Sequence, residues 1–299
     1  MGQPDSPQIR CRIAPTPSGL LHIGNGVNFV LAWLLTRLYS GALRLRIDDA
    51  DSDRTRPEFV EDIFRQLDWL QIDWDEGPSG PDDFGRHFSQ LHRIDRYREA
   101  LAELGRATHL FPCLCSRKEI QARSTDGLYP GTCRETAQPA EAPHAVRVQV
   151  PPGSIIQVEE YEIALCREMG DFVLWRRDDR PAYQLASLVD DIDDRISLIV
   201  RGEDLLTSTA AQLFLADKIE AGSFLAARFH HHPLIIGEEG KKLSKSHDSL
   251  SLAAMREAGA GPATVYRLAA RQLGLPPEQI NSLSDLLAAA GQQKTGAAP

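Results

Sequence analysis

Two short segments of the chain contain residue types that can bind phosphate. His22 and Gly24 lie in "APTPSGLLHIGN", between an alternating apolar segment and a long apolar helical pattern. A glycine lets the backbone approach a ligand, a histidine can donate to a phosphate oxygen, and the start of a helix attracts anions. The second segment, "KKLSKS" at 241–246, interleaves lysines that can neutralise the charge of a departing pyrophosphate. Each alone also fits an ordinary turn or a solvated loop, but together they predict a polyphosphate site.

Two common nucleotide-binding motifs are missing. A dinucleotide fingerprint needs G-x-G-x-x-G, and "GNGVNF" has Phe29 where the third glycine belongs. The pattern G-x-x-x-x-G-K-[ST] does not occur either, which excludes the commonest nucleotide hydrolases.

A cluster of cysteines indicates a metal. Three of the five cysteines, Cys113, Cys115 and Cys133, lie within one short segment. Zinc takes four tetrahedral ligands, mostly Cys and His. Three unliganded thiols in a reducing cytosol are the alternative interpretation. From chemistry alone, the fourth ligand could be water or one of three side chains, Tyr129, His109 or Asp126.

The elements that must position these residues begin with a βαβ unit. The pattern predicts a strand over 8–14, a helix over 26–41 and a strand over 42–48. Asn25 is expected to cap the helix and Gly41 to end it. A right-handed crossover makes the two strands parallel, and ligands bind beyond the carboxyl ends of such strands. The phosphate segment falls at that place.

Further patterns complete an α/β fold. They predict a Rossmann-like doubly wound parallel sheet with an inserted zinc-bearing subdomain and a short helical C-terminal region. The predicted helices cover 57–70, 90–105 and 209–221, and the predicted strands 171–177, 195–202 and 231–237. The expected sections are a first half of the catalytic domain at 1–108, the zinc insertion at 109–170, the second half at 171–240, and the "KLSKS" loop with short helices at 241–299.

The composition limits the functional class. With 42% hydrophobic and 25% charged residues, the chain is typical of a globular protein, and no apolar run approaches the ~20 residues of a membrane span. The N-terminus lacks the pattern of a secretory signal, so a cytoplasmic location without membrane contact is expected. The net charge of −9 means that any RNA must be bound by a local basic patch.

The motifs resemble those of one enzyme family. "HIGN" and "KLSKS" resemble the HIGH and KMSKS signatures of class I aminoacyl-tRNA synthetases, and "RIAPTPSG", "RIDDAD", "AYQLA" and "IVRGEDLL" resemble the glutamyl branch. The resemblance extends from Arg12 to Ser246. Residues 247–299 are too few for the large anticodon-binding region of a glutamyl-tRNA synthetase, so no such domain is expected. The chain therefore resembles the truncated paralogues, the glutamyl-queuosine tRNA(Asp) synthetases.

This resemblance implies a reaction. Members of the truncated family activate glutamate with ATP and Mg²⁺ without needing tRNA, and transfer it to queuosine in the anticodon of tRNA(Asp). The implied partners are glutamate, ATP and the anticodon arm of tRNA(Asp), with no protein partner. Two alternatives stay open: an ordinary glutamyl-tRNA synthetase that charges a 3′ end, and a non-catalytic paralogue that binds an amino acid or adenylate.

The resemblance also implies the site residues, position by position. The catalytic residues are His22, Asn25 and Lys245. The ATP-binding residues are His22, Gly24, Lys242 and Lys245. The glutamate-binding residues are Arg12, Ile13, Ala14, Pro15, Thr16, Asp48, Tyr183 and Arg201. The ligands of a structural zinc are Cys113, Cys115, Tyr129 and Cys133, as in the truncated family.

Two positions depart from the family pattern. Asp48 stands where a glutamate normally binds the substrate ammonium, which costs one methylene of reach. Asn25 replaces the final histidine of HIGH but keeps a side-chain donor, so an active, altered site is expected. The alternative is that Arg12, Asp48 and Arg201 form a structural set of ion pairs at strand ends.

Overall fold

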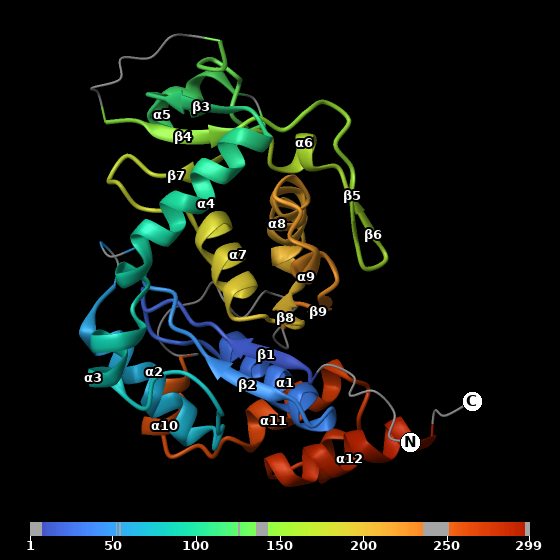
Figure 1. The fold of residues 1–299 in the computed structure, drawn as a ribbon. Helices are drawn as coiled ribbons and strands as arrows, with labels where there is room; N and C mark the ends of the chain where they lie inside the picture. The colour runs from blue at the N-terminus through green and yellow to red at the C-terminus, as the bar shows by residue number, and fades with distance from the viewer. Residues whose placement is uncertain are drawn as a thin grey trace, which may run out of the picture. The chain divides into compact units, whose positions relative to one another are not determined.

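The computed structural model divides into two compact units (Figure 1). The first unit comprises Met1–Ser89, Ile196–Glu203 and Arg228–Pro299, and the second Gln90–Arg195 and Asp204–Ala227. The residues that the structure describes are 8–51, 53, 55–124, 126–135, 143–235 and 251–296.

A parallel four-stranded sheet forms the centre of the first unit. Its order is β2-β1-β8-β9, and every neighbouring pair is parallel. β1 and β2 pair from Arg10 with Ala42 to Ile13 with Leu45. The strands are β1 (Arg10–Ile13), β2 (Ala42–Leu45), β8 (Leu198–Gly202) and β9 (Arg228–His232). The parallel α/β architecture predicted from the sequence is confirmed.

Helix α1 (Ile23–Leu38) connects β1 to β2, and its start corrects one prediction. The N-cap residue is His22, and Asn25 is the third residue inside the helix. The Asn25 Oδ1 atom accepts a hydrogen bond from the His22 backbone N–H at 3.0 Å. Asn25 therefore stabilises the first turn from within, because its side chain satisfies the amide of the cap residue.

Gly41 lies in the chain reversal that follows α1. Ser40 takes the left-handed conformation with φ 51°, and the Gly41 N–H donates to the Thr36 carbonyl at 2.9 Å. A Cβ atom on Gly41 would lie 2.5 Å from the Ile9 carbonyl oxygen. Gly41 therefore lies at the chain reversal, as expected. A glycine is needed there because a larger residue would collide with the backbone of Ile9.

Five further α-helices lie among the described residues of the first unit. Gly26 of α1 faces two side chains of the C-terminal helices, since a Cβ there would lie 3.1 Å from Leu252 and 3.2 Å from Val265. Leu252, Val265 and α1 share one buried hydrophobic core. The helices are α2 (Pro57–Trp69), α3 (Pro81–Asp83), α10 (Leu252–Glu257), α11 (Ala263–Gln272) and α12 (Leu283–Gly296).

The last strand lies earlier than the sequence indicates. The apolar pattern predicts a strand over 231–237, of which residues 236 and 237 lie outside the described part of the chain. Strand β9 ends at His232, and residues 233–235 continue no strand. Pro233 follows, and a proline has no N–H to donate to a neighbouring strand. The three histidines His230 to His232 belong to β9 itself and pair in parallel with β8.

The second unit contains an antiparallel sheet of order β3-β4-β7 and a separate hairpin of β5 and β6. Its strands are β3 (Leu110–Cys113), β4 (Ala145–Val148), β5 (Ile156–Val158), β6 (Tyr161–Ile163) and β7 (Phe172–Trp175). Its helices are α4 (Ile94–Ala107), α5 (Arg117–Arg123), α6 (Leu165–Glu168), α7 (Tyr183–Asp193), α8 (Leu206–Lys218) and α9 (Gly222–Leu225).

A buried carboxylate joins α4 to α7, which lie side by side in Figure 1. Asp190 is 2% exposed and accepts from the Tyr97 hydroxyl at 2.9 Å and from Gln90 Nε2 at 2.7 Å. Arg93 Nε donates to the same carboxylate at 2.9 Å. Burial, reinforced by Asp190, raises the pKa of Tyr97, so this phenol stays a neutral donor.

The section boundaries at 108, 170 and 240 stay a prediction, because compactness divides the chain along different lines. Among the helices that the structure describes, none has the length and apolar character needed to cross a membrane.

Candidate active site and metal centre

The end of β1 brings a buried guanidinium to the carboxyl edge of the parallel sheet. Arg12 is 4% exposed and lies one residue before the end of β1. The segment 14–16 continues directly from that strand end. Parallel strands bind ligands at this edge, so the predicted segment Arg12–Thr16 occupies a suitable place.

Asp48 lies beside this segment. The Arg46 N–H donates to the Ile13 carbonyl and the Asp48 N–H donates to the Pro15 carbonyl, both at 2.9 Å. The backbone after β2 thus continues to follow the backbone after β1. Asp48 is 7% exposed, and the neighbouring Asp49 accepts from the Ser89 hydroxyl. The structure therefore brings Asp48 together with the Arg12–Thr16 segment.

Arg201 lies on the neighbouring strand, two positions nearer the carboxyl edge than Arg12. It is 3% exposed and is the fourth of the five residues of β8, which pairs in parallel with β1 at Cys11 and Leu198. Two buried guanidinium groups and one buried carboxylate thus lie toward the same edge of one sheet. Arginine forks match carboxylates, and a carboxylate matches an ammonium. The edge suits an amino acid with a second carboxylate.

The "HIGN" segment lies at the start of α1. His22 forms an isolated antiparallel bridge with Ser251, and the Leu252 N–H donates to the Leu21 carbonyl at 2.8 Å. A Cβ on Gly24 would lie 3.1 Å from the His22 ring, so the absent side chain leaves room for the imidazole. The first turn of α1 therefore combines a nearby imidazole with a helix N-terminus, which favours phosphate.

The structure does not test three of the predicted residues. Lys242 and Lys245 lie outside the described residues. Tyr183 belongs to the second unit, where it is the first residue of α7 and is 41% exposed. The roles of these three side chains stay predictions.

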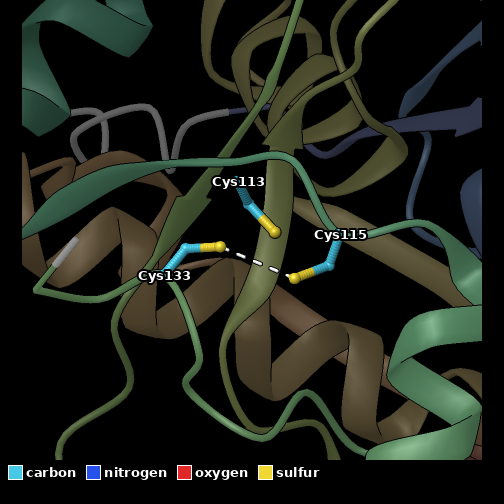
Figure 2. A group of neighbouring side chains, drawn as sticks. All are labelled: Cys113, Cys115 and Cys133. Carbon is cyan, nitrogen blue, oxygen red and sulfur yellow. Dashed lines mark hydrogen bonds between the residues drawn. The ribbon is translucent and has the colours of Figure 1, made fainter. Parts of the chain in front are cut away.

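The three clustered cysteines converge in the second unit, as Figure 2 shows. All three sulfur atoms lie within 4.8 Å of one another, and those of Cys115 and Cys133 are 3.5 Å apart. Tetrahedral zinc with bonds of about 2.3 Å separates two thiolates by about 3.8 Å. Cys113 is 1% and Cys133 5% exposed. The cluster is compatible with zinc in spacing, burial and chemistry.

The thiols differ in their acidity. Burial, with the hydrogen bond to Cys133, raises the pKa of Cys115 to about 11. Burial also opposes ionisation of Cys133, but hydrogen bonds from Tyr129 and the Leu114 backbone outweigh it and lower the pKa of that thiol. Ligand thiols bind zinc as thiolates, so metal binding must displace protons here.

Of the candidates for a fourth ligand, Tyr129 is the one hydrogen-bonded to a cysteine of the cluster. Its hydroxyl oxygen accepts from the Cys133 N–H at 2.7 Å, and its side chain is buried. The Arg147 guanidinium lies 4.2 Å from the centre of its ring. The other candidates, His109 and Asp126, do not join the cysteines in any ligand group of the part of the chain that the structure describes.

Sequence reasoning missed the residues that support the site. Arg46 pairs with Asp48, Ser89 donates to Asp49, and Arg147 covers Tyr129. The spacing of Arg46 and Asp48 was a usable signal, because residues i and i+2 share one side of an extended chain. The other two contacts join residues at least 18 positions apart, which no local pattern marks.

Comparison with known protein families assigns the class. Residues 8–295 match the family described as "tRNA synthetases class I (E and Q), catalytic domain". The chain belongs to this family. A solved glutamate-tRNA synthetase from Elizabethkingia anophelis superposes with a TM-score of 0.76 at 24% identity, covering 94% of this chain and 65% of that one. That likeness shows a common fold.

Particular relatives are more similar in sequence. The chain is 38% identical over 303 residues to the "Glutamyl-Q tRNA(Asp) synthetase" of Symbiobacterium thermophilum, covering 92% of each chain. It is 36% identical to the protein of the same name from Nitratidesulfovibrio vulgaris, covering 91% of this chain and 88% of the relative. The "Glutamate--tRNA ligase" of an Anaeromyxobacter species is 35% identical, but the match spans 58% of that protein. The predicted resemblance to the glutamyl-Q synthetases is confirmed.

Proposed function

We propose that the protein activates glutamate with ATP, without tRNA, and transfers the glutamyl group to queuosine in the anticodon of tRNA(Asp). The observation that carries this proposal is the buried set of Arg12, Asp48 and Arg201 at the carboxyl edge of the parallel sheet, beside the start of α1. The relatives named glutamyl-Q tRNA(Asp) synthetase, which match this chain over about nine-tenths of their length, support the choice of substrates.

Glutamate offers one ammonium and two carboxylates to this edge. In the proposal, Arg12 and Arg201 bind the carboxylates and Asp48 accepts from the ammonium. The segment Ile13, Ala14, Pro15 and Thr16 lines the same place. The motif resemblance adds Tyr183 to the glutamate-binding residues. Because guanidinium forks bind carboxylates in two parallel hydrogen bonds, a buried pair of arginines suits a dicarboxylic amino acid.

ATP enters with Mg²⁺ as its counter-ion. His22, Gly24 and the first turn of α1 with Asn25 hold phosphate, and Lys242 and Lys245 neutralise the leaving group. An oxygen of the glutamate α-carboxylate attacks the α-phosphorus, and the bond from that phosphorus to the oxygen bridging to the β-phosphate breaks. Glutamyl-adenylate and pyrophosphate result. Positioning and electrostatic stabilisation suffice for this step, so no protein nucleophile is required.

The metal site serves structure in this proposal. Cys113, Cys115, Cys133 and Tyr129 would hold zinc with four protein ligands, which leaves no open position for a substrate. Bound zinc would cross-link the end of β3 to the segment around Cys133. Three reduced cysteines held together also suit the reducing cytoplasm, where tRNA is found.

The acceptor distinguishes this function from a second candidate. Relatives named glutamate--tRNA ligase are 33–37% identical, which keeps the charging of a 3′ end as the alternative. A base of an anticodon loop must be unstacked to reach the adenylate, as bases of single-stranded RNA are when proteins bind them. Since the net charge is −9, RNA binding must rest on a few local lysines and arginines.

Two assays test the proposal. Exchange of labelled pyrophosphate into ATP is expected with glutamate alone, and absence of exchange without tRNA would contradict tRNA-independent activation. Labelled glutamate is then offered to tRNA(Asp) with and without queuosine. Transfer only to the modified tRNA supports the proposal, whereas an alkali-labile ester on the 3′ end of tRNA(Glu) would favour the second candidate.

A further inference from the structure

A buried arginine binds both oxygens of the Asp48 carboxylate. Arg46 Nε donates to Asp48 Oδ1 at 2.6 Å, and Arg46 Nη2 donates to Oδ2 at 3.3 Å. The side chains are 7% and 9% exposed. Both residues lie in the extended segment after β2, whose backbone is hydrogen-bonded to Ile13 and Pro15. The pair is thus part of the sheet edge where the glutamate site is proposed.

This geometry determines how Asp48 can bind a substrate. A carboxylate has about four acceptor positions, and the two hydrogen bonds from Arg46 use two of them. A guanidinium is planar, so a bond to each oxygen fixes the plane of the carboxylate as well as its position. Both carboxylate oxygens therefore keep fixed directions toward a further donor, which suits a single ammonium group.

We propose that Arg46 is a positioning residue that fixes the Asp48 carboxylate for the α-ammonium of glutamate. The inference rests on the proposed function, in which Asp48 is the ammonium acceptor. A short aspartate carries the carboxylate one methylene less far than a glutamate would. Holding it in one orientation limits the entropy that is lost on binding, so the shorter side chain can still select an amino acid over the corresponding diacid.

Strand β2, which leads into this segment, offers a matched control. Arg44 lies two residues earlier and pairs with Glu76 at 2.8 Å, but its side chain is 25% and that of Glu76 32% exposed. Arg44 lies within β2, just before that segment, carries the same charge, and has no part in the proposed site. If Arg46 acted only by stabilising the end of β2, the two arginines would give similar effects.

The experiment compares ligands with and without the ammonium group. Kd is measured by calorimetry for glutamate and for glutarate, which lacks the ammonium, in the full-length wild type and in Arg46→Lys and Arg44→Lys. Lysine keeps the charge but cannot donate in two fixed directions. For Arg46→Lys, binding of glutamate is expected to weaken about tenfold, the effect of one charged hydrogen bond, while glutarate binding stays within twofold. Arg44→Lys is expected to leave both constants within twofold.

A double-mutant comparison provides the second measurement. Pyrophosphate exchange gives kcat/KM for Arg46→Gln, Asp48→Asn and the combined variant, and circular dichroism confirms that each is folded. The combined variant is expected to be no worse than Asp48→Asn, because Arg46 acts through Asp48. Additive losses, or equal weakening of glutamate and glutarate, would overturn the inference. Wild-type protein without glutamate-dependent exchange would instead overturn the proposed function, and the inference with it.

Discussion

Substitution of Gly77 by alanine is expected to displace the end of β2. Gly77 has φ 111°, and a Cβ atom there would lie 2.1 Å from the Leu45 carbonyl oxygen. Relieving this overlap requires a shift of about 1 Å in backbone that is fixed by the hydrogen bond from Leu45 N–H to the Glu76 carbonyl. The left-handed strain costs about 1–2 kcal/mol. Overpacking adds about 1–3 kcal/mol, so the free energy of unfolding should fall by about 2–5 kcal/mol.

Urea unfolding followed by tryptophan fluorescence measures this loss. Three of the four tryptophans, Trp33, Trp69 and Trp74, lie in the first unit, so the signal reports mainly on that unit. Because Leu45 directly precedes Arg46, the variant should also raise KM for glutamate in the exchange assay.

Two alanine variants in the same unit separate the causes. Gly274 has φ 66° and no atom within 4 Å of the added Cβ, so Gly274→Ala reports the strain alone. Gly80 has extended backbone and equally open surroundings, so Gly80→Ala should be nearly neutral. The reasoning is refuted if Gly77→Ala destabilises the protein no more than Gly274→Ala does.

Three further predictions concern the carboxylates and the metal. Tyr97→Phe should lower the free energy of unfolding by about 1–3 kcal/mol, because Asp190 loses a buried donor, and a neutral result in urea would contradict that role. Protein purified without chelator should contain one zinc by elemental analysis, and Cys133→Ser but not Cys166→Ser should lose it; zinc retained by Cys133→Ser would exclude this site. For Glu76, burial raises the pKa but hydrogen bonds and charge from two arginines outweigh it, so its folded pKa lies below the ordinary 4.5. Its stabilising contribution should therefore be complete above pH about 5 and vanish as pH falls through the folded pKa. Melting curves of the wild type and Glu76→Gln should converge in acid, and a constant difference would refute this.

Several parts of the fold could be predicted because they depend on local patterns. Alternating apolar residues placed β1 and β2, and the apolar period of α1 with its flanking glycines placed the crossover. The spacing of Cys113, Cys115 and Cys133 indicated a metal, since thiols so close along the chain need little folding to meet. Handedness then required a parallel sheet.

Other features differed from what the local pattern predicted. Asn25 could have capped α1, but the chain enters the helix at His22 and makes Asn25 its third residue. Leu234 and Ile235 could have continued a strand, but β9 ends where the parallel pairing with β8 ends.

The sequence by itself therefore determined the family, the parallel α/β class and the candidate residues, because these follow from side-chain type and from periods shorter than one element. Only the tertiary structure decided that the Arg46–Asp48 pair is buried, that the segment after β2 lies beside Pro15, and that Arg147 covers Tyr129. The physical reason is that a buried charge is stable only when it is paired and hydrogen-bonded. Which side chains are buried, and next to which partners, depends on the tertiary fold.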